Sequence, residues 1–262
     1  MKASLPMYDI IEIRHAHDAL WMGIARHFRK QGLKHVPRRL VHDQPVCSLW
    51  SNKNLFMSQC CGYDIIHSYK HRLKVLASPW FDAPGCSKGN YSSAIVVPTD
   101  STYDDVTEMA GKVAVVNGPE SHSGMNALFS LVSPHSRNNK FFAEIKISGS
   151  HSESVALLVE GKADVASVDC ITYELLRRYR PDAIKGTRQL GLTYSAPAPP
   201  YVTAGTADVE TVERMRNALL DAFEDQNLTG LRQTLLLKKI EISSDATYQR
   251  LLDDFKHNLQ AV

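Results

Sequence analysis

Three consecutive polar residues, Ser121, His122 and Ser123, could together hold a small anion. They follow an apolar run, Val113–Val116, that fits a strand buried on both faces, and they precede apolar residues that recur at helical spacing from Met125. Hydroxyl groups, an imidazole and the first N–H groups of a helix, which have no acceptor within the helix, form a cradle for an oxyanion. Simple helix capping by one of the two serines stays open as an alternative.

Two further strand ends carry polar side chains. The predicted strand Phe141–Ile147 is followed by His151, and the predicted strand Ala163–Val168 is followed directly by Asp169. Because the carboxyl ends of parallel strands lie at one edge of a sheet, we expect His151 and Asp169 near the Ser121–Ser123 turn. Helix capping or surface exposure remains the alternative for the histidine and for the carboxylate.

Aromatic residues are also expected at strand ends. Tyr8 closes a predicted strand over Ala3–Tyr8, and Tyr63 follows a predicted strand over Asn54–Gln59. Ligands of open α/β sheets gather at such ends, so both tyrosines are candidate pocket residues, although packing in the core explains them equally well. Tyr91, which introduces the predicted strand over Ser93–Val97, is a third candidate.

The candidate residues include no Lys or Arg, which suits an oxyanion held by neutral hydroxyls and dipoles. An ionised Asp169 only accepts hydrogen bonds, so it needs a donor from a P–OH group, a ligand ammonium group or a protonated His151. A partly protonated oxyanion fits these groups best. Tyr8, Tyr63 and Tyr91 could surround an apolar or cationic remainder of the ligand.

Apolar spacing predicts the other elements of the chain. Further helices are expected at residues 20–28, ended by Gly32, and at 103–109, 155–159, 173–179, 212–223 and 248–259, and further strands at 73–78, 93–97 and 201–204. Strands that alternate with helices indicate an α/β fold with mainly parallel sheets.

Composition excludes several classes of protein. Thirty basic and 28 acidic residues give a net charge of +2, and no Lys/Arg-rich run with interleaved aromatics indicates nucleic-acid binding. No stretch is apolar and long enough to insert directly into a membrane, and the first residues lack the apolar core of a secretion signal. We therefore expect a periplasmic protein if a leader was removed, and a cytoplasmic protein if Met1 is the native start.

The cysteines predict neither a metal site nor a fixed disulfide framework. Their number is odd and their spacing matches no zinc motif, as the positions Cys47, Cys60, Cys61, Cys86 and Cys170 show. In an oxidising compartment Cys60 or Cys61 could pair with Cys86, whereas buried free thiols are expected in the cytoplasm. We predict no cofactor and no metal.

Several motifs between Tyr91 and Thr203 together point to a known family. They are the segment 90–97, Gly111-Lys112, the segment 120–124 (Glu-Ser-His-Ser-Gly), the segment 149–151 (Gly-Ser-His) and the segment 161–166 (Gly-Lys-Ala-Asp-Val-Ala) with Asp169. In these motifs the chain resembles the substrate-binding proteins of phosphate, phosphite and phosphonate ABC transporters, which have the type II periplasmic-binding-protein fold.

The resemblance implies two lobes that close on a ligand like a hinged clamp. Each lobe would be a mainly parallel sheet flanked by helices, with the ligand cleft between the lobes. Lobe one would comprise residues 1–96 and 201–262 and lobe two residues 97–200. The crossing segments are expected near residues 96–98 and 199–202.

The resemblance also implies roles for the candidate residues. In the family a Ser/Thr-rich turn holds the phosphonate oxygens, and Ser121–Ser123 match this turn in position. His151, Asp169, Tyr91 and, less closely, Tyr63 match the family's histidine, acidic residue and two aromatic residues. A small hydroxyl residue is usual where this chain has His122, which allows a ligand other than a simple phosphonate.

The function implied is capture of a small oxyanion for delivery to an ABC transporter permease, by a monomer that is not an enzyme. One alternative is a cytoplasmic enzyme on the same fold, like those that make thiamine-pyrimidine or menaquinone precursors, with His122, His151 and Asp169 in acid–base roles. Against it, no nucleophile is expected beside an obvious base. The other alternative is a module that senses a ligand and signals its occupancy to a partner.

Overall fold

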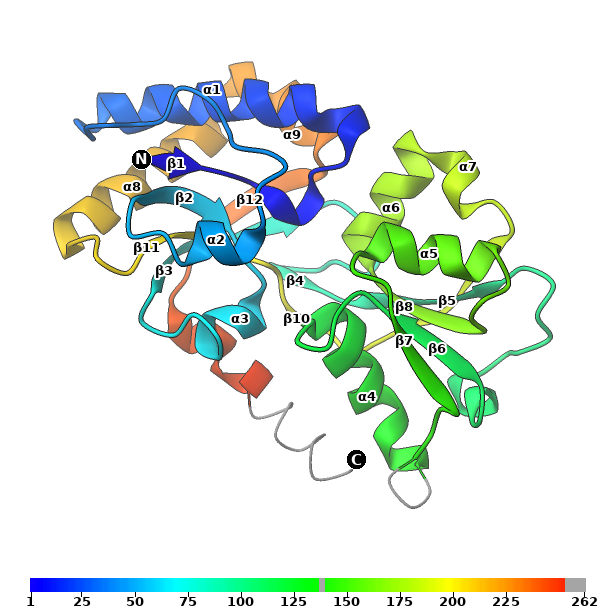
Figure 1. Ribbon diagram of the computed structural model, residues 1–262. Coiled ribbons are helices and arrows are strands. Elements are labelled where there is room, and N and C mark those ends of the chain that lie inside the picture. Colours follow the sequence, from blue (N-terminus) through cyan, green and yellow to red (C-terminus); the bar gives the residue numbers. More distant parts are fainter. Residues whose placement is uncertain (137–139, 253–262) are drawn as a thin grey trace. The chain divides into compact units, whose positions relative to one another are not determined.

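The computed structural model describes residues 1–136 and 140–252 (Figure 1). The chain divides into two compact units. Among the described residues, unit 1 comprises 1–82, 87–89 and 197–249, and unit 2 comprises 83–86, 90–136, 140–196 and 250–252. Within the described residues each unit contains a five-stranded sheet with flanking helices, as the predicted α/β class requires.

Unit 1 is built on a mixed sheet. Its strands, in spatial order, are β1 (Lys2–Ala3), β2 (Leu55–Gln59), β11 (Tyr201–Ala204), β3 (Leu73–Phe81) and β12 (Leu237–Ile242). Its helices are α1 (Arg14–Lys30), α2 (Val46–Trp50), α3 (Gly62–Ile66), α8 (Val209–Glu224) and α9 (Thr229–Thr234), with short 3₁₀ helices at Pro6–Tyr8, Ile11–Ile13, Gln226–Leu228 and Asp245–Tyr248. Helix α1 packs against both α8 and α9 (Figure 1).

Unit 2 has a second mixed sheet. Its strands, in spatial order, are β7 (Glu144–Ile147), β6 (Val113–Val116), β8 (Val165–Asp169), β5 (Ser93–Pro98) and β9 (Thr187–Leu192). Its helices are α4 (Ala127–Val132), α5 (His151–Val159), α6 (Cys170–Tyr179) and α7 (Pro181–Ile184), with a π-helical turn at His122–Asn126 and 3₁₀ helices at Val106–Met109 and Ser133–His135. A two-stranded sheet joins β4 (Asn90–Tyr91) and β10 (Ala196–Pro197).

One antiparallel strand lies inside each sheet, so the sheets are mixed and not simply parallel. Strand β11 runs antiparallel to β2 and β3, and β5 runs antiparallel to β8 and β9. Each of these strands comes directly after a segment along which the chain passes from one unit to the other. Each therefore runs opposite to both of its neighbours, and at the edge of the unit 1 sheet β12 also runs antiparallel to β3.

The core of unit 2 confirms the prediction that Val113–Val116 is a strand buried between two layers. Ala114 and Val116 join the apolar cluster under α4, whereas Val115 joins the cluster under α5 and α6. This alternation is the two-residue period of a strand. Figure 1 shows α4 on one face of the sheet, and α5 and α6 on the other.

Helix α1 has the predicted apolar face and end. Leu20, Trp21 and Phe28 are 1 % exposed or less, and the rings of Trp21 and Phe28 pack with Phe56 at centroid distances of 5.1–6.3 Å. Gly32 adopts a φ of +75°, a conformation that favours glycine just beyond a helix. The helix anchors β2 in the core of unit 1.

The predicted strand over Ala3–Tyr8 is wrong beyond Ala3. Strand β1 ends there, and Pro6 to Tyr8 form a turn of 3₁₀ helix. Pro6 has no N–H to donate to a neighbouring strand and fits the first turn of a helix, which explains the change. The last predicted helix begins with Tyr248 and Leu251, both buried, while its remaining residues from 253 lie outside the described residues.

The compact units differ from the predicted lobe boundaries. Residues 90–96 lie in unit 2, because β5 pairs with both β8 and β9. Residues 199 and 200 lie in unit 1, where the Pro199 carbonyl accepts a hydrogen bond from Gln59 Nε2 at 3.0 Å and the Pro200 carbonyl accepts one from Cys60 N at 3.1 Å.

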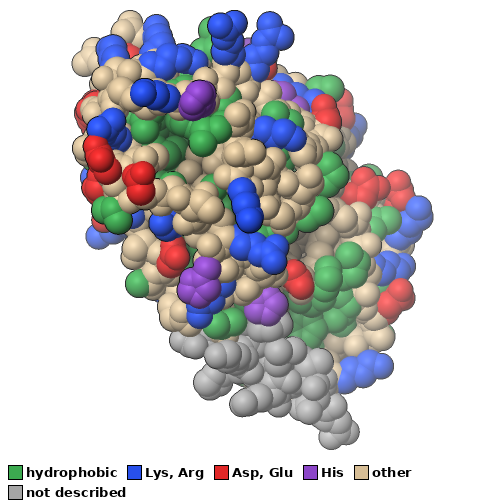
Figure 2. All heavy atoms as spheres, turned by 60° about the vertical axis from the view of Figure 1, so that its left-hand side comes forward, with side chains coloured by type: hydrophobic (Ala, Val, Ile, Leu, Met, Phe, Trp, Pro, Cys, Tyr) green, Lys and Arg blue, Asp and Glu red, His purple; other side chains and the backbone are tan. Residues whose placement is uncertain are grey.

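The surface carries charges of both signs. On the face shown in Figure 2, Lys and Arg side chains occur together with Asp, Glu and His side chains, in keeping with a net charge of +2. Among the described helices, none is long and apolar enough to cross a membrane.

Candidate functional site

Three parallel strands of unit 2 deliver most of the candidate residues to one edge of its sheet. Strand β6 pairs in parallel with β7 and with β8, so the carboxyl ends of the three strands lie together. We call this the unit 2 edge. The turn at 117–123 follows β6, His151 starts α5 after β7, and Asp169 ends β8.

Ser121 caps the helix that follows it, which is the simpler of its two predicted roles. Its Oγ accepts a hydrogen bond from Gly124 N at 3.1 Å. The Ser121 carbonyl accepts from both Met125 N and Asn126 N at 3.1 Å, so the first turn holds one residue more than an α-helical turn. The N–H groups of His122 and Ser123 stand at the start of this turn, where no helical carbonyl precedes them.

Ser123 and His151 are in direct contact. Ser123 Oγ lies 2.8 Å from His151 Nε2, which is a hydrogen bond between the starts of two helices. The Ser123 carbonyl in turn accepts a hydrogen bond of 2.7 Å from the hydroxyl of Ser167 on β8. The pairing of β6 with β7 and β8 therefore fixes the position of the Ser123 hydroxyl.

His122 is enclosed by two tyrosines. Its ring is 2 % exposed and lies 6.3 Å from the Tyr91 ring and 6.2 Å from the Tyr194 ring, measured between centroids. Its Nδ1 is buried and has no hydrogen-bond partner within the described part of the chain. Burial, aided by the positive charge of Arg250, lowers the pKa of His122 to about 4.

His151 is also a neutral imidazole at neutral pH. Burial lowers its pKa to about 4, because the charged ring would lose its hydration. Which ring nitrogen carries the proton depends on the direction of the hydrogen bond to Ser123. Among the described residues no partner for Nδ1 of His151 is found.

Asp169 caps a helix, which is one of the alternatives that its position at a strand end had left open. Its Oδ1 accepts hydrogen bonds from Ile171 N at 2.8 Å and from Thr172 N at 3.1 Å, so the carboxylate caps α6. The residue is 2 % exposed and pairs with Ser93 across β5 and β8. From the sequence, a ligand or His151 was expected to donate hydrogen bonds to this carboxylate. Backbone N–H groups of α6 supply some of these donors.

Tyr8 and Tyr63 lie in unit 1, and their contacts there account for their burial. The Tyr8 ring meets Phe81 edge to face at 5.0 Å, and the Tyr63 ring stacks on His67 at 4.9 Å. Tyr63 is fully buried within α3. Ligand contact by these two tyrosines stays a prediction.

The sequence analysis missed Tyr194, which contacts His122 and donates a hydrogen bond of 3.3 Å to Ser130 Oγ. Tyr194 follows β9, a strand that was not predicted because it has mixed polar and apolar residues and a glycine. The sequence nevertheless contained a signal, since Thr193-Tyr194-Ser195 precedes the proline-rich stretch.

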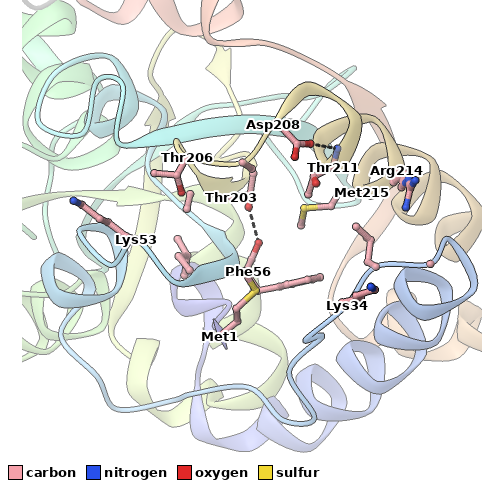
Figure 3. Close-up of a pocket in the computed structure, with 15 residues that line it drawn as sticks. Met1, Lys34, Lys53, Phe56, Thr203, Thr206, Asp208, Thr211, Arg214 and Met215 are labelled. Carbon is pink, nitrogen blue, oxygen red and sulfur yellow. Dashed lines mark hydrogen bonds between the residues drawn. The ribbon is translucent and has the colours of Figure 1, made fainter.

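A separate cavity of about 370 Å³ lies in unit 1 and contains none of the candidate residues. Two of its polar side chains have hydrogen bonds to the backbone: Thr203 donates to the Phe56 carbonyl at 2.8 Å and Asp208 accepts from Thr211 N at 2.7 Å (Figure 3). Lys53 lies on the opposite side of the view from Lys34 (Figure 3). These two lysines therefore do not converge on one point.

The described residues hold no group of three or more His, Cys, Asp or Glu side chains able to bind a metal ion. The unit 2 edge therefore offers hydroxyls, imidazoles, backbone N–H groups, aromatic rings and the carboxylate of Asp169.

The sequence of this chain matches a known protein family. Residues 61–248, more than half of the chain, match the family described as the periplasmic substrate-binding protein of phosphonate ABC transporters. The chain belongs to this family. The match contains the whole region of predicted resemblance, from Tyr91 to Thr203. No curated protein matches the chain in sequence.

Solved structures share the fold of this phosphonate-binding family member at low sequence identity. PhnD1 from Prochlorococcus marinus, in complex with methylphosphonate, is 13 % identical with a TM-score of 0.77, over 100 % of this chain and 98 % of that one. A binding-protein component of an ABC phosphonate transporter from Pseudomonas aeruginosa is 12 % identical with a TM-score of 0.77, over 100 % and 87 %. XAC2383 from Xanthomonas citri, bound to chloride, is 12 % identical with a TM-score of 0.72, over 99 % and 98 %.

These matches confirm the predicted family and the two-lobed periplasmic-binding-protein fold. The phosphonate-binding family consists of substrate-binding components of transporters, so the general role of this chain is ligand binding for an ABC transporter.

Proposed function

We propose that this chain binds a singly charged phosphorus oxyanion at the unit 2 edge and delivers it to the permease of an ABC transporter. The observation that carries the proposal is the 2.8 Å hydrogen bond between Ser123 Oγ and His151 Nε2, at the start of the helical turn that follows β6. Family membership supports a phosphonate-like ligand.

The tautomer of His151 sets the direction of its hydrogen bond with Ser123. If His151 Nε2 carries the proton, it donates to Ser123 Oγ, and the serine hydroxyl proton is then free to donate to a ligand oxygen. Hydrogen bonds in such a chain polarise and strengthen one another. The N–H groups of His122 and Ser123, at the positive end of the helix dipole, add two further donors for the same anion.

The unpartnered nitrogen of His122 favours a ligand that still carries a proton. A neutral imidazole has one nitrogen that accepts a hydrogen bond, and a P–OH group donates one. A phosphonate or phosphite monoanion offers both the oxygens for Ser123 and the P–OH group for His122. Sulfate has no proton to donate, so this arrangement discriminates against it.

The two tyrosines around His122 suit a small substituent on phosphorus. Tyr91 and Tyr194 present ring carbon to the region next to the imidazole, which fits a methyl or short alkyl group. Methylphosphonate, the ligand of the Prochlorococcus marinus neighbour, has this form. An aminated phosphonate would instead bring an ammonium donor for Asp169.

A thermal-shift screen tests the proposal. The probes are phosphate, phosphite, sulfate, methylphosphonate and aminoethylphosphonate, with Ser123→Ala as the comparison variant. A ligand at about 100 times its Kd adds roughly 2.7 kcal/mol to stability, which reads as several degrees in Tm. We expect shifts with phosphite or a phosphonate that shrink in Ser123→Ala. Equal shifts in both proteins, or a response to sulfate alone, would contradict the proposal.

An enzymatic role has one observation in its favour. Ser123 and His151 are a hydroxyl and a base within hydrogen-bond distance, which corrects the prediction that no nucleophile lies beside an obvious base. However, the pKa of about 4 makes His151 a weak base, and no carboxylate orients its Nδ1 within the described residues. We therefore assign the pair to ligand orientation, and turnover of a nitrophenyl phosphonate ester that disappears in Ser123→Ala would overturn this assignment.

We further propose that the chain acts as a monomer in the periplasm, because its family supplies periplasmic components of transporters. Fractionation of cells that express the full natural gene, followed by size-exclusion chromatography of the periplasmic extract, tests both statements. Recovery in the cytoplasm, or elution as a larger assembly, would contradict them.

A further inference from the structure

Two cysteine thiols of unit 2 face each other. Cys86 Sγ lies 3.5 Å from Cys170 Sγ, although the two residues are 84 positions apart in the chain. Sulfurs joined by a disulfide are about 2.05 Å apart, so the two atoms need to approach by roughly 1.5 Å. This contact replaces the predicted option of a bond from Cys86 to Cys60 or Cys61.

The backbone holds both cysteines in this arrangement. Cys86 N donates to the Ala83 carbonyl at 3.0 Å and closes a tight turn. Gly85 has a φ of +90°, and a Cβ there would lie 3.2 Å from both the Cβ and the Sγ of Cys170. Cys170 is the first residue of α6, and its N–H donates to the Ser92 carbonyl at 3.1 Å. The glycine thus lets the turn come close to the helix, and both thiols are held in place.

We propose that Cys86 and Cys170 are a disulfide-forming pair that a disulfide oxidant closes in an oxidising compartment. In the first step the Cys86 thiolate attacks one sulfur of the oxidant R–S–S–R, forms a mixed disulfide and releases one thiolate. The Cys170 thiolate then attacks Cys86 Sγ and releases the second. The protein loses two protons and two electrons, and the oxidant takes them up to become two thiols.

Exposure sets the order of these steps. Cys86 is partly exposed, whereas Cys170 is 3 % exposed, so an oxidant reaches Cys86 first. The hydrogen bond to Cys170, together with burial, raises the pKa of the Cys86 thiol. Because the thiolate is the reactive form, closure should become faster as pH rises.

The bond would fasten a connecting segment to a helix of the candidate site. Residues 83–86 lie on the path along which the chain leaves unit 1 and enters unit 2. Cys170 directly follows Asp169, whose carboxylate caps the same helix. The proposal stands independently of the ligand, and it fits a periplasmic family because disulfides persist in oxidising compartments.

The test uses the full chain with Cys47→Ser, which removes the exposed thiol that would otherwise link two molecules. The protein is incubated with oxidised glutathione, alkylated in denaturant without reductant, and digested for mass spectrometry. We expect one cross-linked peptide pair that contains Cys86 and Cys170. Oxidation should also raise Tm by roughly 5–15 °C, since the bond closes a long loop.

Two further variants make the result decisive. Cys86→Ser and Cys170→Ala, each in the same background, should show no Tm increase with oxidised glutathione. Cys86→Ser changes a partly exposed residue, so it remains informative if the buried substitution impairs folding. The proposal is overturned if both thiols are alkylated after oxidation, if the cross-link involves Cys60 or Cys61, or if Cys86→Ser shows the same Tm increase.

Discussion

The two buried imidazoles of the unit 2 edge predict a specific loss of stability at acidic pH. His122 and His151 titrate near 4 in the folded chain, against an ordinary value of 6.5. The unfolded chain therefore takes up protons first as pH falls, so each histidine destabilises the fold progressively from about pH 6.5 down to about pH 4. Integrated from pH 7 to pH 5, each shift corresponds to a loss of about 2 kcal/mol.

Urea unfolding near pH 7 and near pH 5, followed by circular dichroism, measures this loss. His151→Gln removes one titrating group while keeping a polar side chain beside Ser123. The pH-dependent loss in this variant should be smaller than in the wild type by about 2 kcal/mol. Other ionisable groups contribute equally to both proteins and cancel in this difference.

Val155→Ala is a matched control, because it removes a buried apolar side chain from the same helix, α5. It should lower stability by about 1–3 kcal/mol at both pH values and leave the wild-type pH difference unchanged. If His151→Gln retained the full wild-type pH difference, the inference that this imidazole is buried in its neutral form would be refuted.

Substitutions at three positions separate structural from ligand-binding roles. Asp169→Asn should preserve the cap of α6, since Asn caps about as well as Asp, but it should weaken calorimetric binding of aminoethylphosphonate. Asp169→Ala should cost about 1 kcal/mol of stability. Unchanged affinity for aminoethylphosphonate in Asp169→Asn would leave Asp169 with capping alone. Gly124→Ala should cost about 1–3 kcal/mol in urea unfolding, because the new methyl group would collide with Asn117 Oδ1 and lie 3.3 Å from its backbone N; wild-type stability would contradict this. His122→Phe keeps a ring between the two tyrosines but removes the nitrogens, so affinity for methylphosphonate should fall about fivefold, and an unchanged Kd would exclude the proposed hydrogen bond.

Sequence patterns were sufficient to predict the elements that carry the unit 2 edge. The apolar run Val113–Val116, the polar turn after it, and the strands before His151 and Asp169 all depend on local periodicity and turn chemistry, and the structure has each of them. Parallel pairing of consecutive β–α units then brings their ends to one edge, which general rules of α/β topology predict.

The details that decide the chemistry could not be obtained in this way. The hydrogen bond between Ser123 and His151 depends on the register of β6 against β7 and on two side-chain rotamers. The extra residue in the turn at His122–Asn126 depends on two N–H groups sharing the Ser121 carbonyl. Such features arise from packing between elements and leave no periodic signal.

Antiparallel strands are the other source of error. Strand β5 was predicted, yet its place between β8 and β9 was not, so residues 90–96 were predicted in lobe one, whereas they lie in compact unit 2. Strand β9 was missed for another reason, because it mixes polar and apolar residues and contains a glycine, and Tyr194 after it was missed with it. The contact of Cys86 with Cys170 likewise joins segments that only this sheet brings together.

The most direct test of the central claim is titration calorimetry with methylphosphonate on the wild type and on Ser123→Ala, with Ser136→Ala, beyond the far end of the same helix, as the control. Loss of a hydrogen bond to a charged ligand costs about 1.5–3 kcal/mol, so Ser123→Ala should bind roughly tenfold to a hundredfold more weakly, while Ser136→Ala should bind like the wild type. Equal affinity in all three proteins would show that the ligand is held elsewhere.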